Sequence, residues 1–251
     1  MDEYLIANAP ASMFYIPDFI TEAEEQHILQ SIPVNKWITL SHRRLQAIPT
    51  RLSSTNTLLA SPLPPWLVHP ILDRFKDLAI FADAPHGVNH CLINEYLPGQ
   101  GIMPHEDGAA YHPVVATVSL GSTVVLDVTQ KASIQDADLD RNPDAQREQE
   151  QQQQQQQKQN TSSRILQEPR SLLLTTEPAY TTTLHGIAST REDLDLNPIT
   201  VANWNLLPAS TTQRIEANGG RNLRETRVSL TFRDVRKVSK LGGMVFGKGR
   251  A

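Results

Sequence analysis

Three side chains have the types and spacing of a metal site. His105 and Asp107 flank Glu106, and on an extended chain residues two apart point to the same side. An imidazole nitrogen and a carboxylate oxygen could therefore reach one point, while Glu106 faces away. His185 lies far along the chain in Leu184-His185-Gly186-Ile187, after the apolar run Ser171–Leu174. Alone, each group is more often a structural or solvent-exposed side chain.

Taken together, two histidines and one carboxylate predict the facial triad that suits non-haem iron(II) and leaves coordination positions open. Calcium would need more oxygen ligands. Zinc accepts the same three residues, so the ligands alone leave the identity of the metal open.

A strand near the C-terminus alternates between polar and apolar residues. In Arg227-Val228-Ser229-Leu230-Thr231-Phe232-Arg233, the residues Arg227, Ser229, Thr231 and Arg233 share one face. Val228, Leu230 and Phe232 share the other face and should pack in the core. The polar face could then line an interior where a planar guanidinium binds a carboxylate with two hydrogen bonds. The alternative is a surface strand whose charges face outward.

A second polar pair precedes the histidine–aspartate motif. Asn94 and Tyr96 also lie two residues apart, so their amide and phenol could hydrogen-bond one ligand.

We expect short helices in the N-terminal part of the chain, where they would support these residues. Thr21 and Glu24 have the spacing of a capping box, and a helix within residues 14–34 should follow. Leu67, Ile71 and Phe75 recur at helical spacing within residues 61–83.

From about residue 88 the pattern changes to that of strands. The strand candidates are 90–96, 114–120, 123–128, 171–175, 181–185 and 227–235. Residues 131–164 contain the unbroken run Gln151–Gln157 and are predicted to be a disordered insertion between two strands. Residues 188–223 are predicted to be a second long loop. The fold class expected is mainly β with N-terminal helices, a sandwich or barrel.

Composition limits the classes of function. The 251 residues fit one large domain, and the net charge of −4 does not favour a generally basic nucleic-acid binder. Ten lysines and arginines between Arg214 and Ala251 leave a local basic face open. The single Cys91 excludes a disulfide within the chain and a cysteine-rich zinc site. No signal peptide or bilayer-spanning run is visible, so cytoplasm and nucleus are expected.

The order Asn-x-Tyr, His-x-Asp, His-Gly-Ile and Arg-x-Ser-x-Thr-x-Arg resembles the AlkB family of iron(II)- and 2-oxoglutarate-dependent dioxygenases. The stretch Asn94–Asp107 looks most like the homologue six branch, as do Tyr15–Phe19 and Arg43-Arg44-Leu45-Gln46. The resemblance covers about residues 13–128, 170–187 and 225–236. Glu177–Tyr180 differs from the Gly- and Arg-containing turn of better-known repair members, which leaves the substrate open.

The resemblance implies a double-stranded β-helix, or jelly roll. Residues 1–87 would form a helical extension and substrate lid, 88–236 the core and 237–251 a tail. His105, Asp107 and His185 would hold Fe(II), and 2-oxoglutarate and O₂ would be consumed. Arg227 would bind the far carboxylate of 2-oxoglutarate with Tyr96 and Thr231, while Arg233 and Asn94 would lie near its C1 end. The sequence also allows the two arginines to exchange these roles.

The implied substrate is alkylated single-stranded DNA or RNA, and a monomer is expected. Arg43, Arg44 and Arg51 could contact phosphate, and Trp37, Tyr111 or Trp204 could stack on a flipped base. A protein side-chain hydroxylase or demethylase using the same cofactors is the alternative. A non-catalytic metal-binding protein is the second alternative.

Overall fold

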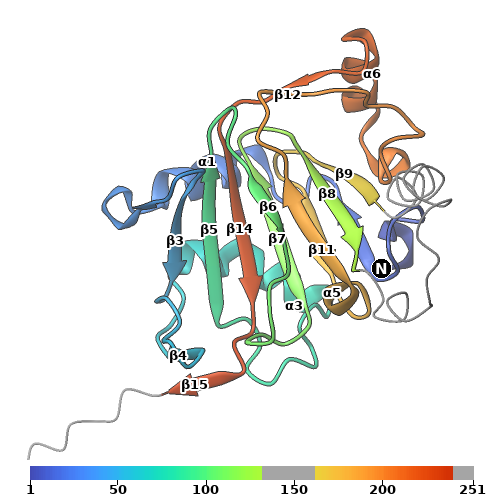
Figure 1. Ribbon diagram of the computed structural model, residues 1–251. Coiled ribbons are helices and arrows are strands. Elements are labelled where there is room, and N and C mark those ends of the chain that lie inside the picture. The colour runs from blue at the N-terminus through green and yellow to red at the C-terminus, as the bar shows by residue number, and fades with distance from the viewer. Residues whose placement is uncertain (132–161, 240–251) are drawn as a thin grey trace, which may run out of the picture.

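Two β-sheets face each other with a cavity between them (Figure 1). The structure is a computed structural model that describes residues 1–131 and 162–239. The large sheet runs in the order β1 (Met13–Ile16), β10 (Leu172–Thr175), β7 (Val115–Leu120), β14 (Arg227–Arg233), β5 (His90–Tyr96), β3 (Arg44–Ile48) and β2 (Ile38–Thr39). The small sheet runs in the order β6 (Ile102–His105), β11 (Thr183–Ile187), β8 (Val124–Gln130) and β9 (Ser162–Gln167). The expected mainly β jelly roll is confirmed.

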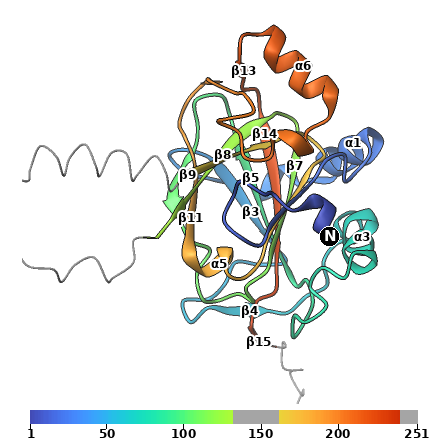
Figure 2. The ribbon, with the colours of Figure 1, turned by 90° about the vertical axis from the view of Figure 1, so that its right-hand side faces the viewer.

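The helices cover the outer face of the large sheet. Figure 2 shows α1 (Glu22–Ser31) and α3 (Asp73–Asp77) on that side, with β8, β9 and β11 on the opposite side. The predicted capping box of α1 is present, because Thr21 accepts from the Glu24 amide and Glu24 accepts from the Thr21 amide. The helix expected within 61–83 is broken into α2 (Pro65–Leu67), η3 (Val68–Leu72) and α3, with non-helical backbone at His69.

The remaining elements lie mostly at the ends of the sheets. They are η1 (Asp2–Tyr4), η2 (Val34–Lys36), β4 (Thr57–Leu59), α5 (Ala179–Thr182), β12 (Glu192–Asp193), η5 (Trp204–Leu206), α6 (Ala209–Ala217), β13 (Asn222–Leu223) and β15 (Lys237–Ser239). Among the described residues, no helix combines the length and apolar character needed to cross a bilayer.

The core has two parts because the large sheet is covered on both faces. Outside it, Ile28 and Phe75 from the helices pack against Ile93 of β5 and Leu230 of β14. Between the sheets, a second cluster joins β1, β8, β9 and β10 to Trp204 and the α6 side chains. All seven residues of β14 are buried, which agrees with an interior polar face and rules out the alternative of a surface strand with outward charges.

Several predicted boundaries need correction. Residues 1–87 contain strands β1, β2 and β3 of the large sheet as well as helices. Residues 188–223 contain α6 and three shorter elements, so this segment is not an extended loop. The predicted strand 181–185 begins only at Thr183, after the helical turn α5. The predicted insertion lies mostly outside the described residues, but its last three residues, 162–164, belong to β9.

Candidate functional site

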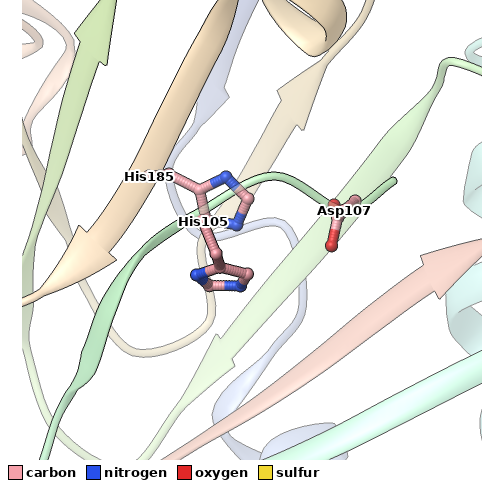
Figure 3. A group of neighbouring side chains, drawn as sticks. All are labelled: His105, Asp107 and His185. Atoms are coloured by element: carbon pink, nitrogen blue, oxygen red, sulfur yellow. The ribbon is translucent and has the colours of Figure 1, made fainter. Parts of the chain in front are cut away.

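The structure brings the three predicted metal ligands together. His105 ends β6 and lies directly opposite His185 of β11, while Asp107 follows two residues later on the loop (Figure 3). One ligand atom from each residue lies within 4.8 Å of the other two, and the imidazole centroids are 4.5 Å apart. One ion could therefore bind all three, which leaves further coordination positions for other ligands.

Two glycines allow β6 and β11 to approach this closely. A Cβ on Gly186 would lie 3.0 Å from the Pro104 nitrogen and 3.1 Å from the Ile102 oxygen. A Cβ on Gly101 would lie 2.2 Å from the Ile187 oxygen. A side chain at Gly101 would force the backbones apart, and one at Gly186 would require β6 to shift beside the contact between His105 and His185.

The hydrogen bond of His105 and the pKa of His185 both suit metal binding. The Nδ1 of His105 lies 2.8 Å from the Met103 carbonyl, which can only accept, so Nδ1 carries the proton and Nε2 keeps its lone pair. Burial lowers the pKa of His185 to about 4, while the nearby Asp107 opposes that shift. The His185 imidazole can therefore present a neutral nitrogen at pH 7.

Arg233 holds the third ligand in place. Its guanidinium hydrogen-bonds the Asp107 carboxylate, and both side chains are almost entirely buried. Arg233 also lies over the Tyr111 ring, 4.8 Å from its centroid. The positive charge of Arg233 is therefore compensated by a metal ligand.

Arg227, at the other end of β14, has no such compensation. Its Nη2 donates to the Ser119 hydroxyl at 2.9 Å and to the Gln167 side-chain oxygen at 2.5 Å, and its Nε has no partner among the described residues. Its guanidinium lies 5.8 Å from the Tyr96 ring centroid. No carboxylate pairs with Arg227 in the described part of the chain. Desolvation lowers its pKa to about 10, so it remains a cation at pH 7.

A buried cation without a counter-ion is costly unless a ligand supplies one. The cavity that Arg227 lines has a volume of about 300 Å³ and is also lined by the metal triad. A ligand that binds a metal at the triad with one end and places a carboxylate at Arg227 with the other would supply the missing counter-ion. Iron(II) and 2-oxoglutarate fit these residues, because a dicarboxylate with a keto group can meet a metal and an arginine together.

The other predicted cosubstrate residues line the same cavity. These are Asn94, Tyr96, Ser229, Thr231 and Arg233. Arg43, from the edge strand β3, also lines it, and its Nε donates to Asn94 Oδ1 at 3.1 Å.

Three further residues were not predicted from the sequence. Ser119 and Gln167 hold Arg227, and Tyr180 lines the cavity while its hydroxyl donates to the Gly108 carbonyl at 2.8 Å. Gln167 ends β9, a strand that begins with the polar residues Ser162-Ser163-Arg164. Alternation of polar and apolar residues did not mark this strand, so no sequence signal pointed to Gln167.

The structure places the candidates for phosphate contact and base stacking in different environments. Arg44 pairs with Glu95 and lies over Trp37, 4.5 Å from the ring centroid, so both side chains already have partners outside the cavity lining. Trp204 is buried in the second core cluster, with side chains of β8 and β9. Of the three aromatic candidates, Tyr111 lines the cavity.

The arginines of the C-terminal basic region also lie in different environments. Arg224 is buried against Asp193, while Arg227 and Arg233 belong to the cavity. Arg221 pairs with Glu192 at the surface. These four arginines therefore do not form one basic face.

Comparison with known proteins places these features in a family. A profile described as "2OG-Fe(II) oxygenase superfamily" matches residues 49–233. The "Probable RNA/DNA demethylase ALKBH6" of Danio rerio is 38% identical over 242 residues, which cover 95% of this chain and 92% of that protein. The "Alkylated DNA repair protein ALKBH8 homolog" of Arabidopsis thaliana is 32% identical over 141 residues, 50% of this chain and 40% of that protein.

A solved structure supports the fold. The structure titled "The structure of OsALKBH1" superposes with a TM-score of 0.51 at 14% identity, covering 89% of this chain and 96% of that one. The chain belongs to the 2OG-Fe(II) oxygenase superfamily and, within it, to the AlkB family, where it is similar to ALKBH6. It is an oxygenase whose cofactors are Fe(II) and 2-oxoglutarate.

Proposed function

We propose that this oxygenase removes methyl or other small alkyl groups from single-stranded DNA or RNA. The relative with 38% identity is named a probable RNA/DNA demethylase, and it aligns along almost the whole chain. The observation that carries the proposal is the composition of the cavity wall. Arg43, Tyr111 and Tyr180 line the same cavity as the triad, and Arg43 has no carboxylate partner in the described part of the chain. A cation beside aromatic rings suits a nucleotide, which offers phosphate and a stacking face.

His105, Asp107 and His185 would hold Fe(II), and Arg227 would bind the far carboxylate of 2-oxoglutarate with help from Tyr96. When bound, this pair supplies oxidation of a substrate C–H bond by O₂, with succinate and carbon dioxide as co-products. Hydroxylation of an N-methyl carbon gives a product that releases formaldehyde and leaves the bare nitrogen. Arg233 keeps Asp107 in position, and the Met103 carbonyl fixes the His105 tautomer.

The test measures formaldehyde and succinate together. The purified protein, with Fe(II), ascorbate and 2-oxoglutarate, is given methylated single-stranded DNA, methylated RNA and methylated histone-like peptides. We expect both products to rise with a nucleic acid and not with the peptides. Turnover with the peptides alone would show instead that the protein is a side-chain oxygenase.

The His185→Ala variant supplies the negative control. We expect it to remain folded, because the variant removes a polar imidazole from a cavity wall, and to produce no succinate. Circular dichroism checks the fold. Succinate formed at the wild-type rate would contradict the assignment of His185 as a ligand.

A further inference from the structure

Gln167 is a buried amide that the metal triad does not use. It is the last residue of β9, is 1% exposed and lines the cavity. Its Oε1 receives two hydrogen bonds, one from Arg227 Nη2 at 2.5 Å and one from the Ser119 hydroxyl at 2.9 Å. The Ser119 hydroxyl in turn accepts from Arg227 Nη2 at 2.9 Å. Three polar side chains, one each from β7, β9 and β14, therefore form one hydrogen-bonded triangle.

The orientation of the amide follows from hydrogen-bond chemistry. A guanidinium only donates, so the Gln167 atom that faces it must be the oxygen. The nitrogen Nε2 is then the amide atom left to donate to a ligand in the cavity that Gln167 lines. Gln167 thus fixes the position of Arg227 while adding one more donor beside it.

Because Gln167 is neutral, it leaves the positive charge of Arg227 available to a ligand. Ser119 and Gln167 orient the guanidinium but do not cancel its charge. A glutamate of the same shape would form an ion pair with Arg227 inside the protein. That pair would lower the attraction of the cavity for an incoming carboxylate and would repel it directly.

We propose that Gln167 strengthens the binding of 2-oxoglutarate by holding Arg227 in place without neutralising it and by donating Nε2 to the far carboxylate. This inference rests on the proposed role of Arg227. It assigns a cosubstrate-binding role to a residue of β9 and an orienting role to Ser119 of β7.

The test uses the isosteric variant Gln167→Glu and measures binding rather than turnover. The full-length protein, loaded with Mn(II) and kept free of O₂, is titrated with 2-oxoglutarate in a calorimeter. We expect the dissociation constant to rise by about tenfold to a hundredfold, the range for losing one charge-assisted contact. The melting temperature without 2-oxoglutarate should stay equal or rise, because Arg227 gains a counter-ion. Gln213→Glu, which makes the same charge change at an exposed position of α6, should bind normally.

A second variant separates charge from packing. Gln167→Met keeps the length of the side chain and leaves Arg227 unneutralised, so we expect an affinity between those of wild type and Gln167→Glu. Binding by Gln167→Glu within twofold of wild type would overturn the inference. Weaker binding by Gln167→Met than by Gln167→Glu would also overturn it, because packing would then matter more than charge.

The Arg227→Met variant separates this inference from the proposed site. Unchanged binding of 2-oxoglutarate by Arg227→Met would refute the assignment of Arg227 itself. Weak binding by Arg227→Met with normal binding by Gln167→Glu would refute only the role of Gln167.

Discussion

The two arginines of β14 differ in how their charge is balanced. Arg233 is paired with the carboxylate of Asp107, whereas Arg227 is held by a hydroxyl and an amide. The two guanidiniums lie six residues apart on one face of one strand. The difference therefore comes from the strands and loops around them. The difference supports the proposed roles, in which Arg227 binds the far carboxylate of 2-oxoglutarate and Arg233 lies at the metal end.

His90 is a buried histidine behind Arg233. It pairs with Arg233 across β5 and β14, its ring lies 6.1 Å from that of Tyr111, and it is 2% exposed. Neither ring nitrogen makes a well-formed hydrogen bond in the part of the chain described, although the Thr50 backbone lies near enough to interact weakly. Burial, and then the charge of Arg233, lower its pKa to about 4, with the Thr50 backbone opposing the shift to a smaller extent.

This histidine should make stability depend on pH. The unfolded chain takes up a proton near pH 6.5 and the folded chain only near pH 4, so stability is lost as pH falls between these values. Between pH 7 and pH 5 we expect wild type to lose about 1–2 kcal/mol more than His90→Leu, from a pKa shift of this size. Urea denaturation at both pH values checks this. Equal losses in the two proteins would mean that His90 is already charged or solvated at pH 7.

At this scale the sequence predicted the groups with strong chemistry. The triad, Arg227 and Arg233 were predicted from the order of their motifs and its resemblance to a known family, and the structure places all five around one cavity. Gln167 and Ser119 were not predicted, because amides and hydroxyls occur everywhere and their meaning depends on which strands become neighbours. That pairing is set by the β7–β14 and β8–β9 ladders, which the sequence does not show.

Among the elements, the contact between β6 and β11 decides whether the two histidines meet. Gly186 lies in this contact, and its missing side chain leaves room for the Pro104 and Ile102 backbone. The spacing of β6 and β11 is therefore important for the metal site, although Gly186 has no side chain to offer an ion.

Gly186→Ala should weaken metal binding more than it weakens the fold. The new methyl group must displace β6, so we expect Mn(II) affinity to fall by at least about tenfold, as when support for a metal ligand is lost. Equilibrium dialysis measures this.

Gly219→Ala is the matched control. Its φ of +64° strains alanine, yet nothing lies within 4 Å of the added Cβ. We expect it to cost about 1 kcal/mol of stability and to leave metal affinity unchanged. Similar metal affinities in the two variants would contradict the role of Gly186.

The elements that sequence patterns missed have identifiable causes. The single helix expected over 61–83 is interrupted at His69-Pro70, although the apolar spacing continues on both sides. The turn α5 replaces the start of a strand because Pro178 precedes it as N-cap and its carbonyl accepts from the Thr181 and Thr182 amides. The strand β14 was predicted because its alternation is unbroken over seven residues.

In the whole molecule, β8 and β9 come together where the described chain is interrupted. Thr129 pairs with Ser162, so the ends of the two strands are neighbours across residues 132–161. A short turn could therefore join them.

Replacing residues 134–159 with a four-residue Gly/Ser turn should keep succinate production within about twofold of wild type, since surface connections tolerate length changes. Removing residues 135–163 should lower succinate production further, because it deletes the first two residues of β9 and disturbs the strand that carries Gln167. Turnover assays and melting curves of both proteins test this. Loss of folding in the shorter deletion would show that residues 134–159 contribute to the stability of the sheets.

The neutral setting of Arg227 also links protein lifetime to metabolism. A ligand that binds only the folded chain stabilises it in proportion to the logarithm of its concentration. 2-Oxoglutarate would supply the missing counter-ion in the interior. In cells depleted of this metabolite, the protein should therefore unfold and be degraded faster. Its abundance, as well as its catalytic rate, would then follow the nutritional state of the cell.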